Sequence, residues 1–281
     1  MSAKTWRRLL QRIGLAAFVL AVLAFNLGPI LWGILGSLKP RAEIMQYPPR
    51  LVPTTISAEH YDAIVGGGFL AAARTSLIYC LVTVTVALLA GSLAAFAMSR
   101  IRFGGRPVVM FAVLAGIPLA SGAAALIVPT YLYMNWINLN DTIFVLPLVY
   151  IAYNLPTAIW VLMGAIDGLS RELDEAAAID GAGRLRTLFE ILLPLCKPAL
   201  GAAALFAFVG AWNEFVSGSV LVDNPALRPV QVAIYQNIGY FGRDWGPLLA
   251  SATLAVLPII LVFLFFGRLL ISGLTSGATK G

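Results

Sequence analysis

The sequence predicts an all-α membrane protein built from several membrane-spanning helices. Three observations support this prediction: apolar residues make up 60% of the 281 positions, charged residues make up only 11%, and mean hydropathy is +0.88. Soluble domains average about 45–50% apolar and about 25% charged residues, because a folded soluble surface needs charge. The composition therefore argues against a soluble enzyme. It also argues against a disordered chain, which requires low hydrophobicity.

Six apolar runs are long enough to form membrane-spanning helices, each of which needs roughly 20 mostly apolar residues. These runs cover residues 13–36, 75–98, 107–132, 142–166, 199–222 and 247–267. The first run is longer than the roughly 7–15 residues of a cleavable signal-peptide core, so we expect it to be an uncleaved anchor. We expect residues 1–281 to form a single transmembrane domain.

The distribution of lysine and arginine predicts the orientation of these helices. With the N-terminus inside, the inner segments are 1–12, 99–106, 167–198 and 268–281. They carry 13 of the 19 basic residues, although the outer segments have a similar total length. Because basic residues favour the cytoplasmic side, both termini are expected in the cytoplasm. The net charge of +6 is then mostly a topology signal and requires no anionic ligand.

Proline and small residues suggest how the spans pack. The prolines within the apolar runs are Pro29, Pro118, Pro129, Pro147, Pro156 and Pro258. Each removes an internal hydrogen bond, which is tolerated where neighbouring helices or a water-filled cavity satisfy the backbone. Ala87, Gly91 and Ala95 recur at four-residue spacing, which suits close contact between helices. Taken together, the breaks favour a transporter or channel over a receptor-like bundle.

The inner segment 167–198 is long and is patterned as two short helices. Ser170 is placed to cap a first helix over residues 171–180, and acidic residues fill its first turns, where the helix dipole favours negative charge. Gly181 is placed to end this helix in a left-handed conformation. Apolar residues at helical spacing predict a second helix from Arg184, closed by Pro194. An amphipathic hairpin lying on the lipid surface is the alternative interpretation.

This segment resembles the EAA loop of ABC importer permeases. Glu175-Ala176-Ala177, then Gly181, Ile191 and Leu193-Pro194, match every signature position of that loop. The resemblance implies a type I ABC importer fold with six transmembrane helices, in which this loop is the coupling helix that sits in a cleft of the ATPase subunit. The residues that it implies for ATPase coupling are Glu175, Ala176, Ala177, Asp180, Gly181, Leu185, Phe189, Leu193 and Pro194.

Three further motifs are similar to those of carbohydrate-type permeases: Ser37-Leu38-Lys39-Pro40, Ser99-Arg100-Ile101-Arg102-Phe103 and Trp212-Asn213-Glu214-Phe215. They point to the shorter of the two membrane subunits of maltose-type systems, in a bacterial inner membrane. The resemblance implies four kinds of partner: a second homologous permease, two ATP-binding cassette subunits, an extracytoplasmic solute-binding protein and a sugar. It also favours the outer loop 223–246 as the docking surface for the binding protein.

The energy source is expected on a partner chain. A phosphate-binding P-loop needs a glycine-rich stretch followed by Lys-Ser or Lys-Thr, and the only lysine before such a residue, Lys4, has no glycine ahead of it. We therefore expect ATP and magnesium on the partner ATPase, no cofactor in this chain and no catalytic activity of its own. The single histidine, His60, lies in an outer segment and is expected to be solvated. No cluster of His, Cys and carboxylate residues has metal-ligand spacing.

Glu214 is the one carboxylate well inside a predicted span. A charge near the bilayer centre costs roughly 2.5–3.5 kcal/mol on insertion scales, so Glu214 should face protein or water. It is predicted, with Trp212, Asn213 and Asn154, to line a translocation path. Sugars suit such a wall, because their hydroxyls need hydrogen-bond partners and their rings stack on aromatic side chains. A hydrogen bond between helices that fixes packing is an equally open interpretation.

The function predicted from the sequence is that of the permease subunit of an ATP-driven carbohydrate importer. An importer of a polyol or glycerol phosphate is the nearest alternative. A proton-coupled secondary transporter, with substrate at the midplane of internal repeats, is the alternative of another class, and a channel-like bundle is a third. The absence of visible inverted repeats and the single buried carboxylate argue against the proton-coupled alternative.

Overall fold

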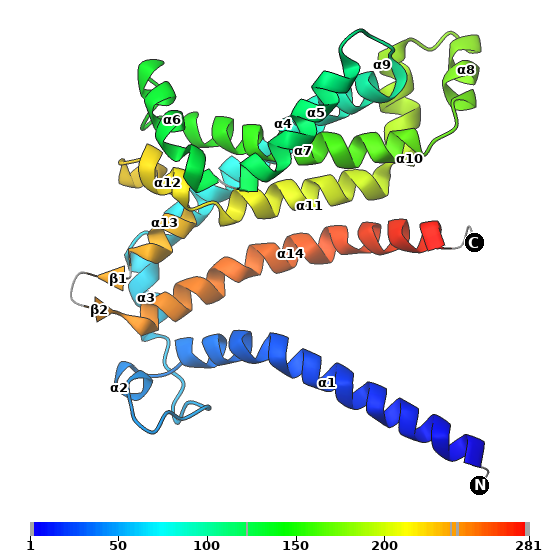
Figure 1. Ribbon diagram of the computed structural model, residues 1–281. Helices are drawn as coiled ribbons and strands as arrows, with labels where there is room; N and C mark the ends of the chain where they lie inside the picture. Colours follow the sequence, from blue (N-terminus) through cyan, green and yellow to red (C-terminus); the bar gives the residue numbers. More distant parts are fainter. Residues whose placement is uncertain (1–2, 122, 237, 240–241, 279–281) are drawn as a thin grey trace. The chain divides into compact units, whose positions relative to one another are not determined.

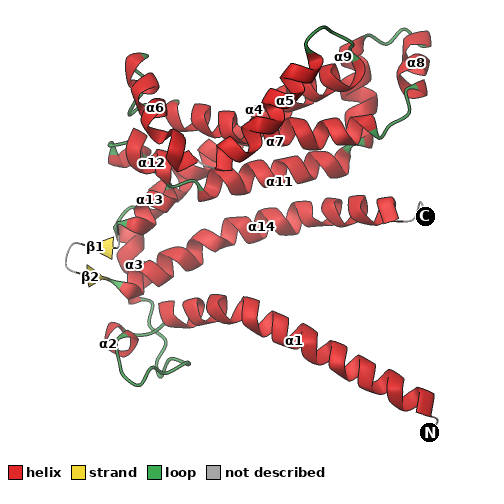
Figure 2. Cartoon of the chain, in the orientation of Figure 1, coloured by secondary structure: helices red, strands yellow, loops and turns green. Residues whose placement is uncertain are grey.

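The computed structural model describes residues 3–121, 123–236, 238–239 and 242–278, and almost all regular structure in this part of the chain is helical (Figures 1 and 2). The helices up to the coupling segment are α1 (Ala3–Ser37), α2 (Arg41–Ile44), α3 (Glu59–Gly66), α4 (Phe69–Arg100), α5 (Arg106–Ser121), α6 (Ala123–Trp136) and α7 (Val145–Asp167). The later elements are α8 (Glu172–Ile179), α9 (Arg184–Arg186), the π-helix Thr187–Leu192, α10 (Leu193–Leu195), α11 (Lys197–Asn213), α12 (Val216–Leu221), the 3₁₀ turn Pro225–Leu227, α13 (Val230–Tyr235), β1 (Ile238–Gly239), β2 (Gly242–Arg243) and α14 (Trp245–Ala278). Strands β1 and β2 pair as an antiparallel hairpin.

The chain forms two compact units. The first unit comprises Met1–Phe69 and Ile234–Val256, and the second comprises Leu70–Ala233 and Leu257–Gly281. The first unit holds α1, α2, α3, the β-hairpin and the first part of α14, whereas the second holds most of α4, the helices from α5 to α12 and the rest of α14. A single transmembrane domain over 1–281 stays a prediction.

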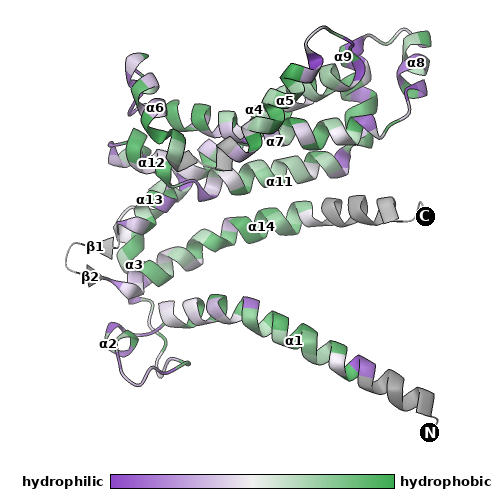
Figure 3. Cartoon of the chain, in the orientation of Figure 1, coloured by the Kyte–Doolittle hydropathy of each residue, from purple (hydrophilic) through white to green (hydrophobic). Residues whose placement is uncertain are grey.

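Four helices in the described part of the chain are long and apolar enough to cross a membrane. They cover Gln11–Ser37, Phe69–Arg100, Val145–Asp167 and Trp245–Gly267. A fifth results if Arg184–Leu195 and Lys197–Asn213, which meet at an angle of 87°, are taken as one span. Figure 3 shows apolar residues extending along these long helices. Membrane-spanning helices are therefore present as predicted, but the count of six is not confirmed.

One of the six predicted runs is divided between shorter helices. Run 199–222 falls on α11 and α12, which are separated at Glu214 and Phe215. Glu214 has extended backbone angles (φ −71°, ψ 119°), which end α11. Composition alone could not distinguish this broken run from a continuous helix, because apolar residues lie on both sides of the break. Run 107–132 falls on α5, which contains Pro118, and on α6; residue 122, between them, lies outside the described residues.

Most prolines are accommodated without ending a helix. Pro29, Pro129, Pro156 and Pro258 lie inside α1, α6, α7 and α14. Pro147 was also expected to break its helix, but α7 begins at Val145. Pro147 therefore lies in the first turn, where a backbone N–H would have no helical partner and proline costs little.

Helix α7 packs closely against its neighbours in the second unit. A Cβ placed on Gly91 of α4 would lie 3.3 Å from the Cβ of Ala158 in α7. The two helices therefore approach closely at Gly91, with no larger side chain between them. Ala87 and Ala95, one turn on either side of Gly91, are fully buried. On α11, a Cβ at Gly210 would run into the side-chain amide of Asn154. The small residues predicted for close packing do pack that way, because van der Waals contact between membrane helices favours them.

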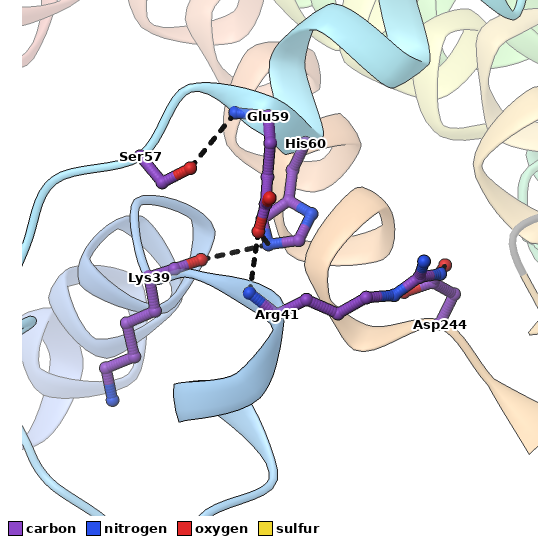
Figure 4. A network of polar contacts seen from close by, with 6 residues as sticks. All are labelled: Lys39, Arg41, Ser57, Glu59, His60 and Asp244. Carbon is purple, nitrogen blue, oxygen red and sulfur yellow. Dashed lines mark hydrogen bonds and ion pairs between the residues drawn. The ribbon is translucent and has the colours of Figure 1, made fainter.

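His60 in the first unit is buried, which makes the expectation of a solvated histidine wrong. The residue is only 3% exposed, and Nε2 lies 2.9 Å from the carbonyl oxygen of Lys39 (Figure 4). A Cβ on Gly246, at the start of α14, would meet the imidazole ring. The partners of His60 lie 21 residues upstream and far downstream in the chain, and no local pattern around His60 predicts them.

A network of polar contacts fixes the segment between α1 and α3. The backbone N–H of Arg41 donates to the Glu59 carboxylate at 2.6 Å, and the Arg41 guanidinium pairs with Asp244 (Figure 4). The buried carboxylate of Glu43 accepts from both the N–H and the hydroxyl of Thr54. Because these contacts connect positions up to 203 residues apart, the segment is held by tertiary structure rather than by local propensity.

Candidate functional site: the segment between α7 and α11

The predicted coupling segment 167–198 forms two helical pieces joined by a turn. Helix α8 comes first, and the turn at Gly181 leads into a helical stretch from Arg184 to Leu195 (Figure 1). This stretch meets α11 at 87°, next to Cys196. Pro198 lies in the first turn of α11, where its fixed φ favours a helix start. The two-helix pattern predicted from the sequence is thus present in the second unit.

Helix α8 begins at Glu172, one residue later than predicted. The hydroxyl of Ser170 accepts the N–H of Glu172 at 3.3 Å, so Ser170 satisfies a donor of the first turn as expected. Glu172, Asp174 and Glu175 lie in the first turn, where negative charge is favoured by the helix dipole.

Gly181 ends α8 in the predicted left-handed conformation, with a φ of +77°. The N–H of Ala182 donates to Ala177 O at 2.8 Å and the N–H of Gly181 to Ala178 O at 3.1 Å, a Schellman motif. Apart from Gly181 itself and its two neighbours in the chain, no described residue has a heavy atom within 4 Å of the position that a Cβ on Gly181 would take. The requirement for glycine therefore comes from backbone conformation rather than from crowding within this chain.

Helix α8 presents most of its surface outwards. Glu175, Ala176 and Asp180 are exposed, whereas Ala177 is buried. Ile179, which the sequence pattern did not single out, is 86% exposed although it is apolar.

The second helical stretch buries part of its apolar surface. Leu188 is fully buried within this chain, and Leu193 is also buried. Leu185 and Phe189 remain exposed at 62% and 41%. Residues 187–192 adopt a π-helix, a rare conformation that is frequent at functional sites. Pro194 does not close the helix, since α10 continues to Leu195.

The C-terminal end of α4 holds the start of the coupling segment. Ser99 Oγ donates to Asp167 Oδ1 at 2.5 Å, and the Arg100 guanidinium donates to Leu169 O at 3.0 Å. Arg100 Nε also lies 2.9 Å from Asp174 Oδ2, in an ion pair whose arginine side chain is only 8% exposed. We call these four side chains, Ser99, Arg100, Asp167 and Asp174, the α4 clasp. Sequence reasoning found none of these pairings, because it had no signal for contacts between distant segments.

A cavity of about 350 Å³ lies beside the clasp. Its lining includes Phe96, Arg100, Arg171, Asp174, Glu175 and Arg184.

Cys196 lies at the far end of the segment, and burial raises the pKa of its thiol. Among the described residues, no group of three or more His, Cys, Asp and Glu side chains could hold a metal ion.

The four residues predicted for a substrate path lie on α7 and at the end of α11. Asn154 is half-buried, donates to Tyr150 O at 2.8 Å and packs on Gly210. Trp212 is buried and stacks on Phe208 with ring centroids 5.7 Å apart. No ligand contact tests a role in transport for these residues, so that role stays a prediction.

Asn213 and Glu214 lie at the break between α11 and α12. Asn213 is exposed and Glu214 is half-buried. The Glu214 carboxylate accepts the N–H of Ser217 at 2.9 Å and that of Gly218 at 3.4 Å, so it caps the first turn of α12. The Gln231 amide donates to Trp212 O at 3.1 Å, at the end of α11. Glu214 therefore has a structural role within its own chain, whatever else it contacts.

The outer loop 223–246 is structured in its described part. Asp141 Oδ1 accepts the N–H groups of Asp223 and Asn224, and α13 follows at Val230. Residues 237, 240 and 241 of this loop lie outside the described residues. Docking of a partner on this loop stays a prediction.

Comparisons with known proteins agree with this architecture. Residues 87–276 match the family model described as "Binding-protein-dependent transport system inner membrane component". The chain is 33% identical to the trehalose/maltose transport system permease protein MalG of Thermococcus litoralis, over 100% of both chains. It is 32% identical to the trehalose transport system permease protein SugB of Mycobacterium tuberculosis, over 92% of this chain and 94% of that protein.

A solved structure has the same fold. It is a chain of a bacterial ABC transporter involved in the import of the acidic polysaccharide alginate, with a TM-score of 0.78 and 22% identity over 95% of this chain and 98% of that one. The family match covers the coupling segment, the α4 clasp and the break after α11. This chain is accordingly a multi-pass membrane protein that belongs to the family of binding-protein-dependent transport system inner membrane components.

Proposed function

We propose that this chain is the membrane-spanning permease subunit of an ATP-driven ABC importer, and that α8 couples it to a separate ATPase. The observation that carries the proposal is the exposed face of α8 with Ile179 and Glu175, held at a fixed angle by the left-handed turn at Gly181. A short helix that projects exposed apolar and acidic side chains suits a rigid joint with another protein. A lipid-surface hairpin would instead place its apolar residues on one continuous face.

The proposed cargo is a carbohydrate delivered by an extracytoplasmic binding protein. Support comes from the relatives named for trehalose and maltose transport and from the structural neighbour involved in alginate import. Asn213, exposed at the break after α11, supplies an amide suited to sugar hydroxyls. A polyol or glycerol phosphate would use similar hydrogen-bonding groups.

The proposed assembly contains this chain, a second homologous permease, two ATP-binding cassette subunits and the binding protein. ATP and magnesium would be bound by the cassette subunits, and this chain would bind no cofactor and catalyse no reaction itself. The family description, which names binding-protein dependence, supports this division of labour.

We propose six crossings of a bacterial inner membrane, with both termini in the cytoplasm. In this arrangement α5 and α6 together form one crossing, and α11 with α12 forms one interrupted crossing. Contacts within the second unit support it, because segments predicted on the same side meet each other. The Arg100 end of α4 contacts residues 167–174, and Asp141 contacts residues 221–224.

Purification with the chromosomally encoded partners tests the function. An affinity-tagged copy of this chain should retain an ATPase, and the purified complex in proteoliposomes should import a labelled disaccharide only with ATP inside and the binding protein outside. A secondary transporter would instead import its substrate without any ATPase, driven by a proton gradient. That result would contradict the proposal.

A further inference from the structure

Helix α4 differs from the other span-length helices of the described chain in having no proline. Its 32 residues run from Phe69 to Arg100 without one, whereas α1, α7 and α14 contain Pro29, Pro156 and Pro258. Proline removes a hydrogen bond and is the commonest cause of kinks in helices. Helix α4 is therefore expected to move as a stiff rod.

One end of this rod is fixed to the coupling segment. The clasp joins Ser99 to Asp167 and Arg100 to Asp174. The ion pair is mostly shielded from water on its arginine side, at 8% exposure. Breaking the pair is costly on the arginine side, because the mostly buried guanidinium would keep only the Leu169 carbonyl oxygen as a partner, whereas the Asp174 side chain is 25% exposed. A displacement of α8 should therefore pull on the end of α4 rather than simply separate from it.

The other end of the rod is fixed to the segment that begins α13. Ser76 Oγ accepts the N–H of Val230 at 2.7 Å, and Tyr79 OH donates to Leu227 O at 3.0 Å. The Ser76 and Tyr79 side chains are buried, at 4% and 1% exposure. Since an α-helix rises about 1.5 Å per residue, the attachments at Ser76 and Arg100 lie about 36 Å apart along the axis. That separation is comparable to the thickness of a bilayer.

We propose that α4 is a rigid link that carries movement of α8 across the membrane to the outer segment 225–230, and that Arg100 and Asp174 are its positioning residues. This inference rests on the proposed function, since the movement comes from a partner ATPase. A packed rod with defined contacts at both ends is the kind of element through which two distant sites bias each other. In this arrangement, closing of the ATPase would displace the outer segment on which a binding protein is expected to dock.

A thiol placed on the outer segment can report this movement. Ala226 is exposed, and Ala226→Cys adds a reactive thiol close to Leu227. The native thiols of Cys80 and Cys196 are buried, which keeps background labelling low. In the assembled complex, the rate of maleimide labelling at position 226 should change severalfold on adding Mg-ATP and sugar-loaded binding protein.

Removing the Arg100–Asp174 ion pair should weaken this response. With Arg100→Ala or Asp174→Ala, labelling without nucleotide should stay unchanged, while the nucleotide-dependent change should shrink severalfold, the contact between Ser99 and Asp167 being the one that remains. The double variant should be no worse than Arg100→Ala, because that variant already removes the ion pair together with the hydrogen bond to Leu169 O. Arg102→Ala, an exposed arginine two residues away, is the matched control and should respond normally. Should the alanine variants fail to assemble, Arg100→Lys and Asp174→Asn retain side-chain size, and each should reduce the response.

The outcomes separate this inference from the function on which it rests. A normal nucleotide response at position 226 in both clasp variants, with ATPase bound and sugar imported, would overturn the rigid-link proposal and leave the importer intact. A response that is absent from the unaltered complex despite active import would overturn it as well. Failure of the unaltered chain to retain any ATPase would instead remove the proposed function.

Discussion

The residue that most constrains the coupling segment is Gly181. Its φ of +77° is unfavourable for residues with a Cβ, at roughly 1–2 kcal/mol for a left-handed conformation. Aspartate tolerates this conformation better than most residues, so Gly181→Asp combines a smaller backbone cost with a new charge at the end of α8. The variant should reorient α8 without affecting membrane insertion. We expect the purified complex to lose sugar import, while the ATPase either dissociates or hydrolyses ATP without response to loaded binding protein.

Gly183 provides a matched control two residues along the chain. Its backbone is extended (φ −71°, ψ 162°), and it is the N-cap of α9, a position where aspartate is favoured. Gly183→Asp introduces the same charge without backbone strain and should retain import. Import at the normal level in Gly181→Asp would mean that the left-handed turn is not needed for coupling.

Glu214, which was predicted to line the substrate path, also caps a helix. Its carboxylate caps α12 through Ser217 and Gly218, and loss of a cap typically costs about 1 kcal/mol. Glu214→Ala should lower the thermal stability and yield of the complex, whereas Glu214→Gln keeps one acceptor oxygen and should restore both. Quantitative size-exclusion chromatography measures this difference. Transport that falls in Glu214→Gln at normal yield would add a role in the path, and equal yield of Glu214→Ala and the unaltered chain would contradict the capping role.

Among single residues, sequence reasoning succeeded where a local pattern specified the geometry. Gly181 follows a helix-forming stretch and has the left-handed φ expected of it. Contacts between distant positions had no such pattern. Tyr79 and Leu227 meet across 148 residues, and Arg100 meets Leu169 across 69. Burial of His60 was missed for the same reason, since an outer segment rich in polar residues gives no sign of the Gly246 backbone that packs on it.

At the scale of elements, the contact between α7 and α11 depends on Gly210. A Cβ there would collide with the Asn154 amide, and overpacking of this kind typically costs about 1–3 kcal/mol. Gly210→Ala should lower the thermal unfolding temperature of the detergent-solubilised protein, and adding Asn154→Ala should restore it. Gly164→Ala is the control, because no atom of the described chain lies within 4 Å of the position that its Cβ would take, and alanine favours helix. A Gly210→Ala variant as stable as the unaltered chain would show that α7 and α11 can separate without cost.

Element boundaries followed from the sequence only where the chain itself provides a signal. Helix α8 was placed to within one residue at each end, because acidic residues, alanines and a glycine mark its course. The division between α11 and α12 was not predicted, since hydrophobicity continues across it. At this division, the polar group that starts the new helix, Glu214, is the same one that was assigned to a path.

At the scale of the whole molecule, the segments that join the helices of the second unit contact one another in two groups. The end of α4 contacts the start of the coupling segment, and the connection before α7 contacts the residues after α12. These groups correspond to the inner and outer segments that the distribution of basic residues predicts. The distribution of basic residues and the tertiary contacts are independent observations. Both favour the same assignment of segments to the inner and outer sides of the membrane.

The crossing formed by α5 and α6 decides this topology, because these two helices are each too short to be certain spans. If they cross together, reporter fusions at residues 105 and 190 should report the cytoplasm, and fusions at residues 60, 140 and 235 should report the outside. If instead they enter and leave the membrane on the same side, residue 140 would report the cytoplasm and residue 190 the outside. An outside signal at residue 190 would put α8 beyond the reach of any ATP-hydrolysing partner, and would contradict the coupling mechanism as well as the six crossings. Alkaline phosphatase and green fluorescent protein fusions at the same positions give opposite signals, so each position provides its own control.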